Sequence, residues 1–209
     1  MIRTKDKQTI EVVAVTEQAN LVGEVAVTES NTCWCSDGFE IACENGQVVT
    51  GTFTKDCCDR EIISWRAKSG RGLPDELVRE MLIAAVETRF GTVVACSGEL
   101  QSSSDNGGAY RAHETHAAAR QLGITPVHTP VHTPVCSLQP NGMAESFVDT
   151  FKRDYVSRMD RSTAAIVLTQ LPGAFTHFNE IPLHSAPKLK SPRMYRRELA
   201  HPAQENDAN

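Results

Sequence analysis

The chain has 209 residues, of which 40% are hydrophobic and 22% charged. This composition is typical of an ordinary globular protein with one domain, or with one domain and extended ends. No stretch approaches the eighteen apolar residues of a membrane span, and the first ten residues have no apolar core, so neither a span nor a secretory signal is predicted. We therefore expect a cytoplasmic protein.

The net charge of −5 argues against DNA binding by the charge of the protein as a whole. The segment from Ser146 to Ala200 nevertheless carries nine Lys or Arg against five Asp or Glu, a net of +4. A basic C-terminal quarter beside an acidic body would suit a protein that binds phosphates on one face and metal ions on another. The alternative is a solvated pair of basic helices.

The first half of the chain predicts strands. Residues 1–28 show no clear period and are left unassigned. Strands are predicted at Thr32–Ala42, Val48–Thr54 and Arg60–Ala67, the first two joined by an Asn-Gly hairpin turn at Asn45. Three consecutive antiparallel strands are the simplest interpretation.

Helices and strands alternate after that. Apolar residues spaced by three and four predict a helix at Pro74–Phe90. A short buried strand is expected at Thr92–Ala95, a second helix at Tyr110–Leu122, and a proline-rich loop at Ile124–Pro140. The order of elements predicts an α/β fold with a mixed sheet and helices around it.

Two more helices are predicted, from near Gly142 to Met159 and from Ser162 to Asn179. The loop before them contains a tandem repeat, Val127–Pro130 followed by a second V-H-T-P. We interpret it as a local duplication, because surface loops tolerate insertions best.

Three acids occur where a fold could bring them together. Asp37 lies in the first strand, Asp105 follows a strand-like segment, and Glu145 lies near the start of the third helix. Carboxylates are the ligands that Mg²⁺ and Mn²⁺ prefer. Two such ions can activate an attacking oxygen and stabilise the leaving oxygen of a phosphodiester.

The sequence around these acids resembles the integrase-like core of the IS-three-type bacterial insertion-sequence transposases, from about Val25 to Ala200. Five motifs in the same order carry the resemblance: S-D-G-F-E, C-C-D-R-E-I-I-S-W, S-D-N-G-G-A-Y-R-A, N-G-M-A-E-S-F-V-D-T-F-K-R-D-Y and the terminal H-F-N-E with S-P-R-M-Y-R-R. Five ordered motifs are far more specific than one short pattern.

The resemblance implies a ribonuclease-H-like fold with a mixed five-stranded sheet flanked by helices. It implies that Asp37, Asp105 and Glu145 form an Asp-Asp-Glu triad holding two Mg²⁺ or Mn²⁺ ions. The implied chemistry is DNA cleavage followed by strand transfer. The expected domains are an unassigned segment 1–28, a catalytic core 29–180 and a basic C-terminal tail 181–209.

Four residues are candidates for DNA contacts. Lys152 follows Glu145 by two helical turns, so both side chains point the same way, and Lys152 is the first candidate for a phosphate contact. Arg153 is the second. Asn106 and Asn141 would shape the backbone beside the metals, or are ordinary turn residues.

Several residues depart from the family pattern. The repeat lengthens the segment between Asp105 and Glu145. Ser102–Ser104 replace an apolar strand end, which we expect to anchor the second aspartate less firmly. Asp149 replaces a lysine that faces DNA in relatives, and Ile181–Ser185 replace a segment richer in histidine. These changes suggest an inactive or truncated copy.

The expected partners are transposon ends and target DNA in the bacterial nucleoid. The sequence has no helix-turn-helix region before the core, so we expect a homo-oligomer or an assembly with an upstream helix-turn-helix subunit. Two alternatives stay open: a non-catalytic DNA-binding or oligomerisation remnant of a transposase, and a metal-dependent nuclease of the same fold.

Overall fold

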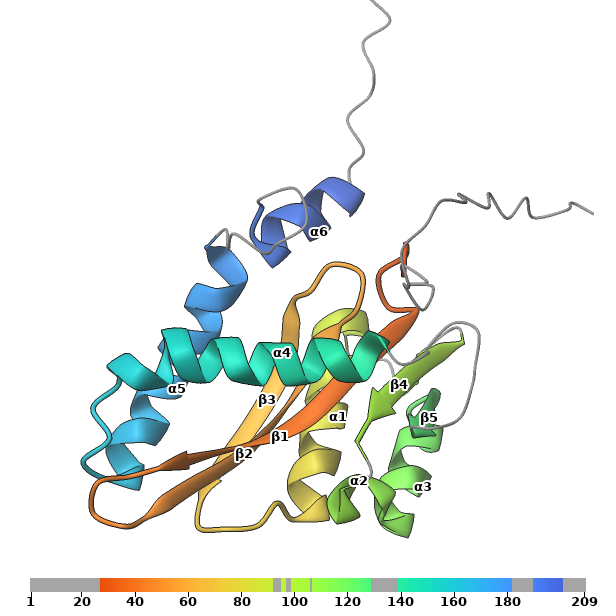
Figure 1. Ribbon diagram of the computed structural model, residues 1–209. Helices are drawn as coiled ribbons and strands as arrows, with labels where there is room; N and C mark the ends of the chain where they lie inside the picture. Colours follow the sequence, from red (N-terminus) through yellow and green to blue (C-terminus); the bar gives the residue numbers. More distant parts are fainter. Residues whose placement is uncertain are drawn as a thin grey trace, which may run out of the picture.

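The computed structural model describes residues 27–91, 95–96, 99–105, 107–128, 139–181 and 190–200. They form one sheet with helices on both faces (Figure 1). Most of the segment 1–28, most of the strand expected at Thr92–Ala95 and the second V-H-T-P copy lie outside the described residues.

The first three strands form an antiparallel meander, as predicted. They are β1 (Cys33–Ala42), β2 (Val48–Asp56) and β3 (Ile62–Ser69), and β1 pairs with β2, which pairs with β3. The turn between β1 and β2 has Gly46 at a φ of 83°, which a glycine adopts without strain. The second strand runs two residues further than predicted, because Lys55 and Asp56 continue the ladder.

Two parallel strands complete the sheet. β4 (Leu100–Ser104) pairs with β1 and β5 (Ile124–His128) pairs with β4, so the strand order is β3-β2-β1-β4-β5. The prediction of a loop from Ile124 was wrong for the first five residues. Pro126 has no N–H to donate, but β5 is an edge strand, where proline is tolerated.

The predicted mixed five-stranded sheet is therefore confirmed. The serine run is part of it: Ser102, Ser103 and Ser104 are buried in β4 and pair with β1 on one side and β5 on the other. Their polar side chains did not prevent the strand, because a central strand has ladder partners on both edges.

The helices cover both faces of the sheet and include one that was not predicted. Their bounds are α1 (Asp75–Phe90), α2 (Gly108–Arg111), α3 (His113–Gln121), α4 (Gln139–Asp154), α5 (Ala164–Glu180) and α6 (Pro192–Ala200), with a short 3₁₀ turn at Val156–Arg158. The single helix predicted at Tyr110–Leu122 is two helices that meet at Ala112. None of the described helices is long and apolar enough to cross a membrane.

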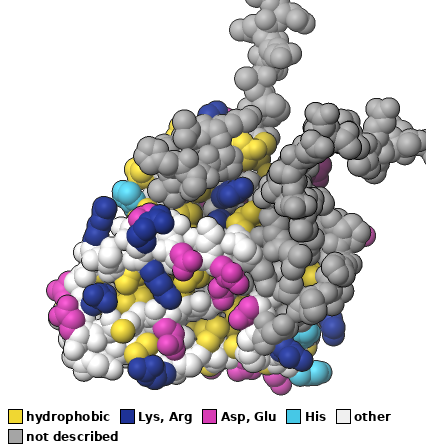
Figure 2. Space-filling model, viewed as in Figure 1, with side chains coloured by type: hydrophobic (Ala, Val, Ile, Leu, Met, Phe, Trp, Pro, Cys, Tyr) yellow, Lys and Arg dark blue, Asp and Glu magenta, His cyan; other side chains and the backbone are white. Residues whose placement is uncertain are grey.

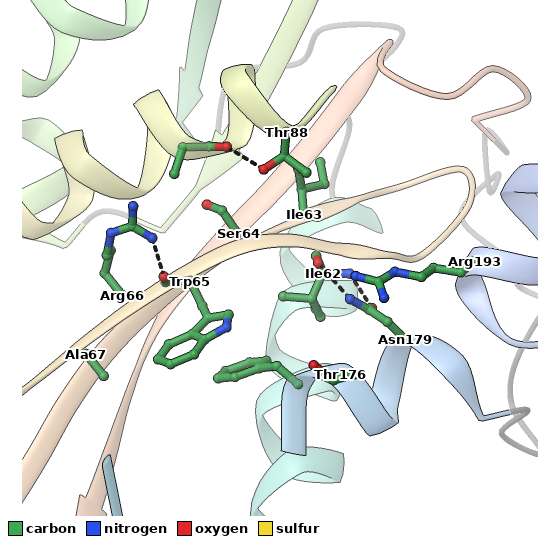
Figure 3. Close-up of a pocket in the computed structure, with 12 residues that line it drawn as sticks. Ile62, Ile63, Ser64, Trp65, Arg66, Ala67, Thr88, Thr176, Asn179 and Arg193 are labelled. Atoms are coloured by element: carbon green, nitrogen blue, oxygen red, sulfur yellow. Dashed lines mark hydrogen bonds between the residues drawn. The ribbon is translucent and has the colours of Figure 1, made fainter. Parts of the chain in front are cut away.

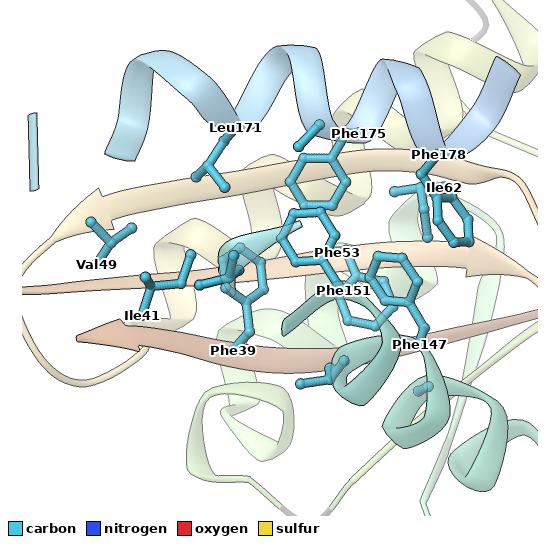
Figure 4. Close-up of a cluster of buried hydrophobic side chains, with 14 of the residues drawn as sticks. Phe39, Ile41, Val49, Phe53, Ile62, Phe147, Phe151, Leu171, Phe175 and Phe178 are labelled. Carbon is cyan, nitrogen blue, oxygen red and sulfur yellow. The ribbon is translucent and has the colours of Figure 1, made fainter. Parts of the chain in front are cut away.

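Two hydrophobic clusters hold the three layers together. On one face, α4 and α5 pack on β1 and β2 through a group of aromatic rings (Figure 4). Phe147 of α4 lies 4.5 Å from the Phe53 ring, and Phe151 lies 4.7 Å from the Phe175 ring of α5. On the other face, Val78, Met81, Leu82, Ala85 and Val86 of α1 pack on Trp34 and its neighbours. Successive residues of β1 alternate between the two clusters, which fixes the face on which each side chain points.

A close contact between β1 and β2 requires glycine at one position. Gly51 is the ladder partner of Phe39, and a Cβ at residue 51 would lie 2.3 Å from the Phe39 ring. The Phe39 side chain therefore covers the β2 backbone and reaches the aromatic rings of α4 and α5, at 6.0 Å from Phe151 and 6.1 Å from Phe175. This packing supports the strand that carries Asp37.

Candidate active site

The ladder of β1 and β4 brings the two aspartates side by side. Ser36 of β1 is the parallel partner of Ser104 of β4, and each aspartate is the next residue along its strand. Neighbouring strands lie about 4.8 Å apart. Asp37 and Asp105 therefore lie next to each other, at the point where the pairing of β1 with β4 ends. Alternation along β1 puts Asp37 on the face that α4 and α5 cover.

Helix α4 brings the third carboxylate to the same face. Ala144, Phe147, Val148 and Phe151 of α4 are buried in the aromatic cluster, whereas Glu145 is exposed beside them. The apolar positions recur every three or four residues, so the helix lies on β1 with one stripe and leaves Glu145 at its margin. Lys152 lies two turns further on and is also exposed.

The pKa of Asp37 depends on Asp105, Glu145 and Lys152. It is raised from 3.8 to about 6, chiefly by burial and also by the carboxylates of Asp105 and Glu145, while Lys152 lowers it. The N–H of Gly38, which donates to Asp37 Oδ1 at 2.7 Å, also lowers it. Three carboxylates and one lysine thus lie close enough to act on one another.

The carboxylates are not gathered around one point. Among the described residues, no group of three or more His, Cys, Asp or Glu side chains is close enough to hold a metal ion as it stands. Asp37 accepts from its neighbour Gly38, and Asp105 accepts from the N–H of Gly107 at 2.9 Å. Both aspartates therefore accept from backbone N–H groups of their own segments.

The segment after Asp105 is anchored to the sheet by a buried tyrosine. The hydroxyl groups of Tyr110 and Thr52 of β2 lie 2.7 Å apart, and the N–H groups of Tyr110 and Arg111 donate to Gly107 O. A Cβ at residue 107 would lie 2.8 Å from Asp105 Oδ1, so a larger residue there would displace the Asp105 carboxylate. The motif D-N-G-G-A-Y thus holds Asp105 near β1. Its role was assigned by resemblance, whereas the tyrosine anchor was not predicted.

The four candidate DNA contacts have different surroundings. Lys152 is exposed, but Arg153 donates from Nε and Nη2 to the two carboxylate oxygens of Asp154, at 2.7 and 2.8 Å. This pair raises the pKa of Arg153 and lowers that of Asp154. Asn106 lies outside the described residues, and Asn141 lies in α4 with a side chain that is not described.

Much of the basic C-terminal quarter is bound to acids of the protein itself. Arg193 and Arg196 of α6 donate to the two oxygens of Glu61 at 2.9 and 3.0 Å, and Lys190 pairs with Glu198. Basic and acidic side chains are interspersed on the face that carries α4 (Figure 2). The predicted basic face is therefore smaller than the count of Lys and Arg suggests.

The same acids form a buried ionic cluster that sequence reasoning missed. Arg89, at the end of α1, donates to both oxygens of Asp59 at 2.9 and 3.0 Å and lies 3.3 Å from Glu61. The side chains of Arg89 and Asp59 are fully buried. The motif C-C-D-R-E between β2 and β3 was quoted only for its resemblance, but its acids join α1, α6 and the sheet.

Three antiparallel strands followed by two parallel ones, with helices on both faces, define the ribonuclease-H-like class of proteins. A chain in the cryo-EM structure of the simian T-cell lymphotropic virus intasome in complex with PP2A regulatory subunit B56 gamma superposes with a TM-score of 0.55. The sequence identity is 18%, over 87% of this chain and 57% of that one, so this similarity concerns the fold.

The integrase core domain family matches residues 27–134. The putative transposase InsD for insertion element IS2E of Escherichia coli K12 is 46% identical over 178 residues, which are 85% of this chain and 79% of that protein. The transposase InsD for insertion element IS2A/D/F/H/I/K of Escherichia coli is also 46% identical over 178 residues, and this chain spans 57% of its length. The chain therefore belongs to the integrase-core family of insertion-element transposases, and the resemblance found in its motifs is confirmed.

Proposed function

We propose that the chain cleaves DNA phosphodiester bonds and transfers the resulting strand to a target, with Asp37, Asp105 and Glu145 as the metal-binding residues. Members of the family are polynucleotidyl transferases of DNA transposition and integration that use divalent metal ions. The observation that carries the proposal is the raised pKa of Asp37, to which the other two carboxylates contribute. A buried aspartate whose charge is destabilised by two neighbouring carboxylates is a candidate site for cations.

The residues fit divalent cations by their chemistry. Three carboxylates offer hard oxygen ligands, and two ions of Mg²⁺ or Mn²⁺ would offset their mutual repulsion. Metal ions bound there would activate the attacking oxygen and stabilise the leaving oxygen of the phosphodiester. The carboxylates of Asp37 and Asp105 would exchange their bonds to Gly38 and Gly107 for bonds to the metal ions.

The other residues would bind and orient the DNA. Lys152, on the same side of α4 as Glu145, would contact a phosphate beside the metals, and Arg153 would contribute less because Asp154 already binds it. Asn106 and Asn141 would shape the backbone beside the carboxylates. Asp149, exposed one turn after Glu145, would repel a phosphate and weaken this contact.

The proposed partners are transposon ends and target DNA, in the nucleoid of the bacterial cytoplasm. The chain would act as a homo-oligomer, or together with an upstream subunit that supplies a helix-turn-helix region. A non-catalytic remnant is the second candidate, because the three carboxylates are not gathered around one point and Asp149 faces the same side. A nuclease of the same fold would cleave DNA without strand transfer.

The test is nicking of a supercoiled plasmid in Mn²⁺ or Mg²⁺ by the full chain and by Glu145→Gln. We expect the chain to nick the plasmid and Glu145→Gln to be at least about a hundredfold slower, because a metal ligand is lost. The matched control is Glu87→Gln, which changes an exposed acid on α1, on the opposite face of the sheet, and should nick normally.

Inactivity of the unchanged chain under both metals would favour the remnant. Nicking that survives in Glu145→Gln would contradict the assignment of the triad. Nicking without joined products, when an oligonucleotide with a free 3′-hydroxyl is supplied, would identify a nuclease.

A further inference from the structure

A groove of about 400 Å³ runs along the outer edge of β3, between α1 and α5 (Figure 3). Its floor includes β3 from Ile62 to Ala67. Thr88 of α1 lies on one side, and Phe175 and Asn179 of α5 lie on the other. The proposed active site lies at the junction of β1 and β4, two strands away in the sheet, so this groove is a separate surface.

The backbone of β3 is open along this groove. β3 is the first strand in the sheet order, so among the described residues only β2 pairs with it. The amide of Asn179 donates to Ile62 O and accepts from Ile62 N–H, both at 2.9 Å. These are the two bonds that a neighbouring strand would make, and they close the edge at the Ile62 end.

Further along β3, the exposed side chain of Arg66 covers part of the edge. Trp65 O accepts from Nη1 of Arg66 at 2.9 Å, and the Arg66 side chain is 40% exposed. An exposed edge strand pairs readily with another extended segment. The arginine can swing away at little cost, since its one acidic neighbour, Glu80, is 3.9 Å away and itself half exposed.

The groove offers apolar contacts and a basic rim. Trp65 stacks on Phe175 with ring centroids 4.7 Å apart, and Ala67 of β3 and Ala84 of α1 also line the groove. Arg66 and Arg193 are its basic lining residues, and Lys68 and Arg71 follow Arg66 along the chain. An extended segment with apolar side chains on one face and acids nearby would match this surface.

We propose that residues Thr9–Thr16 of this chain, T-I-E-V-V-A-V-T, pair with the outer edge of β3 as an added strand. The segment is rich in β-branched residues, which favour strands. From Gln8 to Ala26 the sequence has three acids, Glu11, Glu17 and Glu24, and no Lys or Arg. Its charge is thus complementary to the basic rim, in agreement with the apolar groove and the open edge.

The first described residues, which follow the proposed strand in the chain, lie toward the Ile62 end of β3. Val27 packs against the aromatic cluster, and Ser30 Oγ donates to Asp59 Oδ2 at 2.7 Å beside the turn that leads into β3. The ten residues 17–26, which link the proposed strand to Val27, span up to about 33 Å when extended. Six residues of β3 span only about 20 Å, so this linker is long enough for residues 9–16 to reach the edge. With Thr16 at the Ile62 end and Thr9 toward Ser69, the added strand would run antiparallel to β3.

Hydrogen exchange of the peptide that covers Ile62–Ser69 tests this proposal in the full chain. Val13→Pro removes a ladder donor from the added strand without touching the sheet, and Gln18→Pro is the matched control outside it. We expect Val13→Pro to speed exchange of these β3 amides on the order of tenfold and Gln18→Pro to leave it unchanged. Addition of a synthetic peptide with the sequence of residues 9–16 should restore protection in Val13→Pro.

Two results would overturn the proposal. Equal exchange in the unchanged chain and Val13→Pro would show that this segment does not cover β3. Protection that appears only as the protein concentration rises, and is insensitive to Val13→Pro, would show that a second copy occupies the groove instead. A charge test is independent of both: Glu11→Lys should weaken protection, and Glu11→Lys with Lys68→Glu should recover it.

Discussion

Asp37 illustrates what a single residue gains from its neighbours in the fold. In the sequence it is one acid among many, and only the ladder pairing of Ser36 with Ser104 shows that it lies next to Asp105. The pKa of its carboxyl is raised to about 6 because burial and two other carboxylates act on it together. The motif pointed to the residue, but its electrostatic state depends on contacts between segments far apart in the chain.

Lys152 and Arg153 are neighbours in sequence that we expect to differ in DNA binding. Lys152→Ala should lower the slope of log affinity against log salt concentration by about 0.9, the loss of one phosphate contact. Arg153→Ala should lower it less, because Asp154 already offsets the charge of this arginine. The measurement is fluorescence anisotropy with duplex DNA at several salt concentrations, with Arg158→Ala as an exposed basic control. A larger loss for Arg153→Ala than for Lys152→Ala would contradict the assignment.

Tyr110 should contribute to stability through its hydroxyl. Tyr110→Phe leaves the Thr52 hydroxyl buried without its 2.7 Å partner, which we expect to lower the free energy of unfolding by about 1–2 kcal/mol. The control is Tyr155→Phe, whose hydroxyl bonds to His177 at an exposed position and should change stability by less than about 0.5 kcal/mol. Urea denaturation measures both. Equal losses would mean that burial of the Thr52 bond does not matter.

At the scale of elements, α6 shows how a basic segment becomes part of the fold. The helix was not predicted, because its sequence P-R-M-Y-R-R-E-L-A has little apolar surface to bury. Its attachment is ionic: Arg193 bridges Glu61 and Glu180, and Arg196 binds Glu61. Glu61 is also beside Arg89 of α1, so one carboxylate joins two helices to the start of β3.

Removal of Glu61 should therefore loosen α6. We expect Glu61→Ala to lower the free energy of unfolding by about 3 kcal/mol, the lower end for a broken buried ion pair, because Arg193 and Arg196 are about a third exposed. Glu180→Ala removes only the outer partner of Arg193 and should cost less than about 1 kcal/mol. Chemical denaturation measures both losses, and hydrogen exchange of α6 should speed up in Glu61→Ala alone. Unchanged exchange of α6 would contradict ionic docking.

At the scale of the whole molecule, sequence reasoning predicted the class of fold and most of the periodic elements. β1, β2, α1 and α5 were placed within about two residues, the usual uncertainty of helix ends. β5 was missed because Pro126 indicated a loop, and β4 matches the strand-like segment expected before Asp105, although its start was not predicted. Both strands are specified by pairing with neighbours rather than by their own composition, which a single sequence does not reveal.

The acids of the candidate site were named from the sequence, but the contacts around them were not predicted. The three acids were assigned by resemblance to a family, and the comparisons confirm the family while leaving the roles of the acids as a proposal. The binding of Arg193 and Arg196 to Glu61 could not be predicted, because the partners lie more than a hundred residues apart.

The tandem V-H-T-P repeat offers a test of how much the fold tolerates between β5 and α4. Deletion of Val131–Pro134 shortens this connection and should stabilise the protein by no more than about 0.5 kcal/mol, since loop closure depends weakly on length. Replacement of the same four residues by Gly-Ser-Gly-Ser keeps the length and is the control. Thermal and urea denaturation are the measurements. A loss above about 2 kcal/mol in the deletion would show that the second copy packs in the core.

The order of the three acids along the chain also sets when the site can exist. Asp37 lies on β1, and Glu145 lies on α4, roughly a hundred residues later. At about 5–20 residues per second, a ribosome needs roughly 5–20 s to make the intervening chain. During this interval the nascent protein lacks Glu145, the third of the proposed metal-binding residues. A copy released early would carry an incomplete triad, and under the proposed function we expect it to leave the DNA beside its own gene uncut.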